Sequence, residues 1–247
     1  MNNSPVSLSR RGFSLIELIV VIAIIAIIAG FTVPQAGQIL KGSTLTQGST
    51  ILTDQIRLAR EYALTKNSKV EVRFYQYGDP ETPGESVTTP SSGQYRAMQI
   101  FQVLTVTATQ VEAPVPLDKV QVLPQGVIME LGVANSPPPP AGPYGAAYST
   151  ILANPNSPVV TGPQNAAQNS SLAQLPRGVG YNYNYVSFRF LQDGSTTLAP
   201  TGTVWYMTLH NINDKGYLQQ GGMPFNYFCL QIDPVVGTTK PYRPQAG

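Results

Sequence analysis

The sequence predicts an α+β fold, in which one long amino-terminal helix precedes a mainly antiparallel β-sheet. Residues 18–31 form an unbroken apolar run, and an amphipathic repeat follows it between residues 52 and 63. Short segments that alternate apolar and polar side chains then occupy most of the remaining chain. Helix first and strands afterwards is the order typical of the α+β class.

Residues 13–33 are predicted to cross a membrane as a helix. Only Ser14, Glu17 and Thr32 are polar among these 21 residues. A helix rises about 1.5 Å per residue, so the segment spans about 30 Å, the thickness of the apolar core of a bilayer. The basic residues at positions 10–11 predict a cytoplasmic amino terminus.

Secretory signal peptides and ordinary signal anchors share this basic start and apolar run. A signal peptide has an apolar stretch of about 7–15 residues followed by a small-residue cleavage site. The present run is longer and lacks a well-placed site of that kind. Neither class accounts for Glu17, because a carboxylate inside a membrane helix costs at least about 2.5 kcal/mol on insertion scales.

Residues 11–18, RGFSLIEL, resemble the cleavage and methylation motif of type IV prepilins and type II secretion pseudopilins. The resemblance implies that a prepilin peptidase removes residues 1–12 as a leader peptide by cutting after Gly12. It also implies that the new amino terminus, Phe13, is N-methylated. The glutamate four residues further on, Glu17, is a hallmark of the family.

The resemblance implies a role for Glu17 in assembly by charge pairing. Cleavage leaves a positive amine on Phe13, and Glu17 lies one helical turn along the same face. The carboxylate can neutralise the amine of its own chain or of a neighbouring subunit, and a paired charge in an apolar bundle costs less than a lone one. A second interpretation places Glu17 at the level of the cytoplasmic headgroups before assembly.

Residues 34–67 are predicted to continue the helix as an amphipathic segment. Pro34 is expected to kink it, because proline removes a backbone hydrogen bond. Arg57 and Glu61 are placed to form an ion pair one turn apart, and Asn67 is suited to a left-handed stop. The apolar stripe of this segment consists of Leu52, Ile56, Ala59 and Ala63.

Residues 68–247 are predicted to form a β-rich globular domain with loop insertions at 77–93 and 135–184. Turns are expected at residues 124–126 and at the Asp-Gly pair of residues 193–194. The predicted strands cover residues 69–74, 94–104, 119–123, 127–131, 185–191, 204–210 and 227–232.

The insertion at 135–184 contains a proline run at 137–140, which favours polyproline II over a strand. A loop of this length is either functional or poorly ordered, and the sequence leaves loose packing and a contact surface open. Tyrosines lie in and beside it, and such a group serves either recognition or packing. They are Tyr144, Tyr148, Tyr181, Tyr183 and Tyr185.

A second resemblance concerns the body of the protein. Residues 54–64, followed by the strand at 70–72, resemble minor pseudopilins of the GspH/FimT type, and residues 188–195 resemble their strand and turn. The ending at residues 233–237, DPVVG, is similar to protein D of the Verru_Chthon cassette group. These resemblances imply a type IV pilin-like fold, although the large insertion at 135–184 departs from a compact domain of the GspH type.

The resemblances imply a structural minor pilin or pseudopilin that is assembled into a type IV pilus or a type II secretion-like pseudopilus. The expected partners are prepilin peptidase, other pilin subunits and inner-membrane lipid. The expected location is the bacterial inner membrane, in a single pass with a periplasmic domain, and later the filament. The alternative is a membrane-tethered adhesion module that uses the Pro/Gly-rich insertion.

No catalytic, cofactor or metal site is expected. The single histidine, His210, and the single cysteine, Cys229, lie on predicted strands, where structural roles are favoured, and one thiol forms no intrachain disulfide. The small acidic loop of Asp79, Glu81 and Glu85 lacks the pattern of a calcium loop and is expected to be solvated. Net charge is only +2, so no basic surface for nucleic acid is expected.

Overall fold

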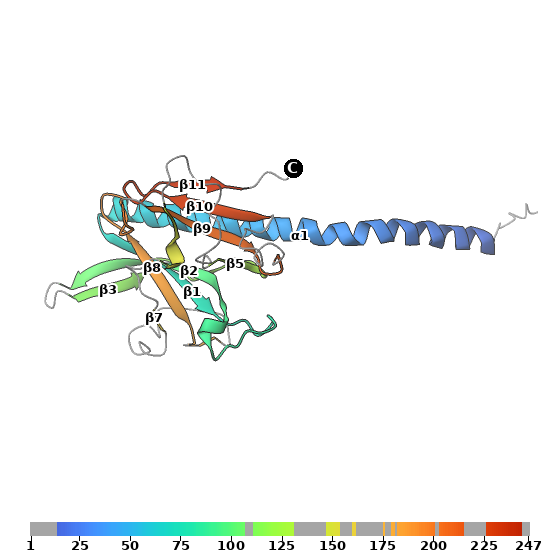
Figure 1. Cartoon of the computed structure of the whole chain (residues 1–247), viewed down its shortest axis with the longest axis horizontal. Helices are drawn as coiled ribbons and strands as arrows, with labels where there is room; N and C mark the ends of the chain where they lie inside the picture. Colours follow the sequence, from blue (N-terminus) through green and yellow to red (C-terminus); the bar gives the residue numbers. More distant parts are fainter. Residues whose placement is uncertain are drawn as a thin grey trace, which may run out of the picture. The chain divides into compact units, whose positions relative to one another are not determined.

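The computed structural model describes residues 14–106, 111–130, 147–153, 160–161, 175, 179–180, 182–200, 203–214 and 226–243. The chain divides into two compact units, Met1–Gly42 and Ser43–Gly247. Figure 1 shows the long helix α1 and the strands that follow it in the chain. The predicted α+β class with a mainly antiparallel sheet is confirmed.

Helix α1 covers Leu15–Lys66. It ends where predicted, because Asn67 adopts a left-handed backbone with φ of 48°, a conformation that Asn tolerates better than most residues. The helical assignment continues through Pro34, but the side chains of residues 30–41 lie outside the described part, so the kink at Pro34 stays a prediction.

The large apolar side chains at the start of α1 are uncovered within this chain. Those between Leu15 and Ile28 are 46–75% exposed. A search of the described residues finds no helix that meets the length and hydropathy needed to span a membrane. The span at residues 13–33 therefore stays a prediction.

The second half of α1 packs on the sheet through the predicted stripe. Each of its four members is fully buried, and Leu45 extends the stripe by two turns. These side chains belong to one core cluster with apolar residues of β1, β2, β8, β9 and β10. The spacing of four, three and four residues places the stripe on one helical face, which explains why a single helix covers the sheet.

The described strands form one sheet in the order β11-β10-β9-β5-β2-β1-β8-β7, and β3 and β4 also pair with β2. All described pairs are antiparallel except β6 with β9, which is parallel. The strands are β1 Lys69–Tyr77, β2 Gln94–Val106, β3 Val111–Pro116, β4 Gln121–Val122, β5 Val127–Met129, β6 Ala147–Thr150, β7 Val160–Thr161, β8 Asn184–Phe190, β9 Thr203–Asn211, β10 Tyr227–Ile232 and β11 Thr239–Tyr242. Two short 3₁₀ helices are η1 Pro90–Ser92 and η2 Ile151–Ala153.

Each of the seven predicted strands is present, although the segment predicted at 119–123 shrinks to the two residues of β4. The turns are confirmed as well, with left-handed glycines at Gly126 and Gly194. The sequence prediction missed β3, β6, β7 and β11. Two of these, β3 and β11, contain proline, a residue that is usually confined to the edge strands of a sheet.

Both faces of β1 are buried. Val70, Val72 and Phe74 face the core that α1 covers. The opposite face carries a second apolar cluster, which includes Tyr75 and Tyr77. The other buried members of this cluster are Ala97, Val179, Tyr183 and Tyr185.

The described parts of the 135–184 insertion include buried side chains. Ile151 and Leu152 are buried in the main core, at 0% and 2% exposure. Val179 and Tyr183 are buried in the second cluster. Apolar side chains within a polar stretch thus tie the insertion to both faces of the sheet, which sequence composition alone does not reveal.

The sheet consists of two parts joined by one short strand. Strand β5 pairs with β2 at Tyr95–Met129 only, and with β9 at residues 127–129. Among the described strands, β5 is thus the one that pairs with both parts, β1, β2 and β8 on one side and β9, β10 and β11 on the other. Outside the strands, Thr196 N–H also donates to the carbonyl oxygen of Pro234 at 2.9 Å. Helix α1 packs against side chains from both parts.

Candidate functional site

The first described residues form a capped helix start. The backbone N–H of Ser14 donates a hydrogen bond to Glu17 Oε2 at 2.8 Å, and Leu18 N–H donates to Ser14 O at 3.2 Å. A Ser followed three residues later by a Glu whose side chain reaches back to the cap N–H is half of a capping box. The sequence signal for this cap is the pattern Ser-x-x-Glu of residues 14–17.

The predicted cleavage residues, Gly12 and Phe13, lie outside the described residues. The structure therefore does not test the predicted pairing of Glu17 with the amine of Phe13. It does place the Glu17 carboxylate on the N–H of Ser14, one residue from the predicted new amino terminus.

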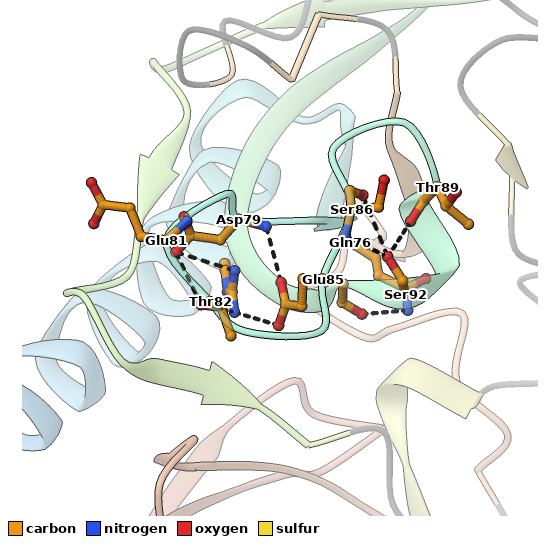
Figure 2. Close-up of polar contacts among 10 residues, drawn as sticks. Gln76, Asp79, Glu81, Thr82, Glu85, Ser86, Thr89 and Ser92 are labelled. Atoms are coloured by element: carbon orange, nitrogen blue, oxygen red, sulfur yellow. Dashed lines mark hydrogen bonds and ion pairs between the residues drawn. The ribbon is translucent and has the colours of Figure 1, made fainter.

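Two carboxylates of the acidic loop between β1 and β2 bind an arginine, whereas the third, Glu81, is exposed. Arg96 Nη2 donates to Glu85 Oε1 at 2.7 Å, and Arg96 Nη1 lies 3.4 Å from Asp79 Oδ2. Glu85 also accepts a hydrogen bond from the backbone N–H of Asp79 (Figure 2). The expectation of a solvated loop is wrong for Glu85, whose side chain is only 5% exposed and whose charge is balanced by Arg96, while Glu81 is exposed as expected. Among the described residues, no group of three or more His, Cys, Asp or Glu is placed to hold a metal ion.

His210 lies on β9, which confirms its predicted position on a strand. Its ring is buried, with Nε2 2.6 Å from Glu130 Oε2 and Nδ1 2.9 Å from the carbonyl oxygen of Asn211. Both nitrogens therefore have partners, and the contact with Glu130 fastens β9 to the end of β5. The pair borders a pocket of about 450 Å³, which is lined by Thr82, Pro83, Gly84, Glu85, Ser92, Gln94, Ile128, Glu130, His210 and Ile212.

Cys229 is a buried thiol in β10 with 3% exposure. Burial raises its pKa to about 11, and a hydrogen bond with Thr208 lowers it in part. We expect the folded chain to react with 5,5′-dithiobis(2-nitrobenzoic acid) at pH 8 only on the timescale of unfolding, because the reactive form is the thiolate. The same chain in denaturant should release one equivalent of product at once, and rapid reaction of the folded chain would contradict this prediction.

A charged network lies on the face of the sheet opposite α1. Arg73 Nε binds Glu71 Oε1 at 2.5 Å, and Arg189 Nη2 binds Glu71 Oε2 at 3.0 Å. Glu112 then bridges Arg189 and Lys69 at 2.5 and 2.8 Å. Burial tends to lower the pKa of Arg73, but the neighbouring Glu71 carboxylate outweighs it and the pKa is raised.

The buried part of this network is also covered by aromatic rings. The guanidinium carbon of Arg73 lies 4.3 Å from the ring centroid of Phe101 and 4.7 Å from that of Tyr185. The side chains of Glu71 and Arg73 are each only 6% exposed. Sequence reasoning missed this feature because alternating charges on a strand usually indicate a solvated face. The described Tyr183 and Tyr185 likewise pack inside the protein, while Tyr144, Tyr181 and the side chain of Tyr148 lie outside the described part.

Comparisons with known proteins identify the amino-terminal segment. Residues 8–33 match the family described as the prokaryotic N-terminal methylation motif. A search of curated proteins gave no match. Two solved structures of the minor pseudopilin EpsH, from the type 2 secretion system of Vibrio cholerae, are similar to the chain. The first is 11% identical to this chain with a TM-score of 0.36, and the match covers 82% of this chain and 98% of the EpsH chain. The second is 16% identical with a TM-score of 0.35, and the match covers 83% of this chain and 99% of the EpsH chain.

The match at residues 8–33 confirms the motif that residues 11–18 predicted. The TM-scores are below 0.5, so the fold is described from the elements of the chain itself. Those elements are an amino-terminal helix followed by a mainly antiparallel sheet. The chain therefore carries the prokaryotic N-terminal methylation motif at its amino-terminal end.

Proposed function

We propose that the protein is a minor structural subunit of a type IV pilus or a type II secretion-like pseudopilus. Prepilin peptidase cuts after Gly12 and the new amino terminus, Phe13, is N-methylated. The single observation that carries the proposal is the methylation motif at residues 8–33.

Before assembly, residues 13–33 hold the chain in the bacterial inner membrane. Arg10 and Arg11 favour a cytoplasmic amino terminus, which leaves the β-rich domain in the periplasm. The apolar side chains between Leu15 and Ile28, uncovered within the chain, support this location. A continuous apolar surface of this kind needs either lipid or other apolar helices around it.

In the filament, the same apolar helix packs against helices of other pilin subunits. Glu17 neutralises the amine of Phe13, either within the chain or on a neighbour. The hydrogen bond from Ser14 to Glu17 supports this role, because it directs the carboxylate toward the start of the helix.

The proposed role is structural and not catalytic. The adhesion alternative has less support, because described parts of the 135–184 insertion, such as Ile151 and Leu152, pack inside the protein.

Mass spectrometry of the mature chain tests the processing step. We expect a chain that begins at N-methylated Phe13, and a Gly12→Val variant that keeps residues 1–12. Gly42→Ala is a matched control, because a Cβ at Gly42 meets no atom within 4 Å. Cleavage near Ala36, or an uncut wild-type chain in cells that contain prepilin peptidase, would contradict the proposal.

A further inference from the structure

A small pocket lies between α1 and the turn that joins β10 to β11. Its volume is about 280 Å³. It lies wholly within the unit Ser43–Gly247. The lining residues are Arg57, Arg60, Glu61, Gly237, Thr238 and Thr239.

The pocket holds hydrogen-bond donors that lack partners among the described residues. Arg60 Nε donates to the carbonyl oxygen of Val236 at 3.0 Å, which orients its guanidinium and leaves the two terminal nitrogens available. Arg57 is exposed, and no described carboxylate lies within 4.0 Å of it. The predicted ion pair between Arg57 and Glu61 is therefore wrong, although both residues border the same pocket.

The wall opposite the helix is a fixed turn. The Asp233 carboxylate accepts hydrogen bonds from the N–H groups of Val235 and Val236, at 2.9 and 3.1 Å. Gly237 has φ of 69°, and a Cβ there would lie 2.0 Å from the carbonyl oxygen of Gly194. The turn is therefore shaped before any ligand arrives, which reduces the entropy lost on binding.

Exposed apolar side chains stand beside the pocket. Val235 and Val236, in the turn that supplies Gly237, are 59% and 50% exposed. Leu64 is 43% exposed and lies beside Gly194, which itself contacts Gly237. Apolar groups around charged donors are typical of surfaces that bind a polypeptide rather than a free ion.

We propose that this pocket binds a carboxylate side chain of a partner polypeptide, with apolar residues of the partner on Val235 and Val236. Among the lining residues, two guanidinium groups outweigh the one carboxylate of Glu61, and the nearby Asp233 carboxylate is bound by the N–H groups of its own turn. The guanidinium fork matches a carboxylate with two parallel hydrogen bonds. The proposal goes beyond the role in a filament and does not depend on it.

Titration calorimetry of the full chain in detergent micelles tests this site. The probe is the peptide acetyl-Leu-Glu-Leu-amide, with acetyl-Leu-Gln-Leu-amide and inorganic phosphate as comparisons. We expect the glutamate peptide to bind at least about tenfold more tightly than the glutamine peptide, because one charge-assisted hydrogen bond contributes about that factor. Binding should weaken as salt is raised.

Three variants separate the site from general charge effects. Arg57→Gln should weaken peptide binding about tenfold without changing thermal stability, because Arg57 has no described partner to lose. Glu61→Gln should strengthen binding, since it removes a like charge from the pocket. Lys66→Gln is the matched control, because it changes the net charge of the same helix outside the pocket and should leave binding unchanged.

The proposal is overturned if no peptide binds, if both peptides bind equally, or if Arg57→Gln and Lys66→Gln have the same effect. Binding of phosphate without binding of the glutamate peptide would also overturn it, because the site would then take a free anion. None of these results depends on cleavage after Gly12 or on filament assembly.

Discussion

Replacing Glu17 with alanine is expected to leave cleavage after Gly12 intact and to abolish assembly. Under the proposed processing, the variant leaves the amine of Phe13 without a carboxylate in an apolar bundle, and an unpaired buried charge costs about 3–5 kcal/mol. This corresponds to a loss of more than about a hundredfold in incorporation. Purified filaments would be probed for the subunit, and its amino terminus would be checked by mass spectrometry.

Glu17→Gln separates charge pairing from helix capping. A glutamine carbonyl can still accept the hydrogen bond that Ser14 N–H now donates to Glu17, but it carries no charge. We expect Glu17→Gln to fail in assembly as Glu17→Ala does, and Ser14→Ala to assemble. If Glu17→Gln assembled normally, the cap and not the charge would be the required feature, and the pairing hypothesis would be wrong.

Glu71→Ala is expected to destabilise the β-rich domain by about 3–5 kcal/mol, a large part of the about 5–15 kcal/mol typical of a domain. The reason is that Glu71 balances Arg73, whose side chain is 6% exposed, and also binds Arg189. The measurement is the urea midpoint of the full chain in detergent, followed by circular dichroism.

Glu112→Ala is the matched control for Glu71→Ala. Glu112 also binds Arg189, but its side chain is 33% exposed. Ion pairs at that exposure contribute about 0–1 kcal/mol. Equal shifts of the urea midpoint in the two variants would show that burial of the Glu71–Arg73 pair does not decide the stability.

Local signals in the sequence were sufficient for most of the fold. Alternating side chains marked β1, the stripe through Ile56 marked the buried face of α1, and Asn67 and Gly194 marked a helix end and a turn. Such features depend on neighbouring residues only, so one sequence reveals them. The methylation motif at residues 8–33 is equally local, which explains why it could be recognised.

Features that depend on distant pairing could not be predicted. Strand β6 lies in a Pro-rich stretch and becomes a strand only because β9, more than fifty residues away, pairs with it. The carbonyl oxygen that accepts the hydrogen bond of Arg60 belongs to Val236, 176 residues further along the sequence. The burial of Glu71 and Arg73 likewise follows from rings such as Phe101 and Tyr185, which other strands contribute.

The single Tyr95–Met129 pair between the two parts of the sheet has a mechanical consequence. The two parts of the sheet share few backbone hydrogen bonds at β5 in the described part of the chain, and one more runs from Thr196 N–H to Pro234 O. Side chains of α1 contact strands of both parts. A pulling force on the first half of the helix, which is proposed to join the filament, would thus reach both parts of the sheet through the second half.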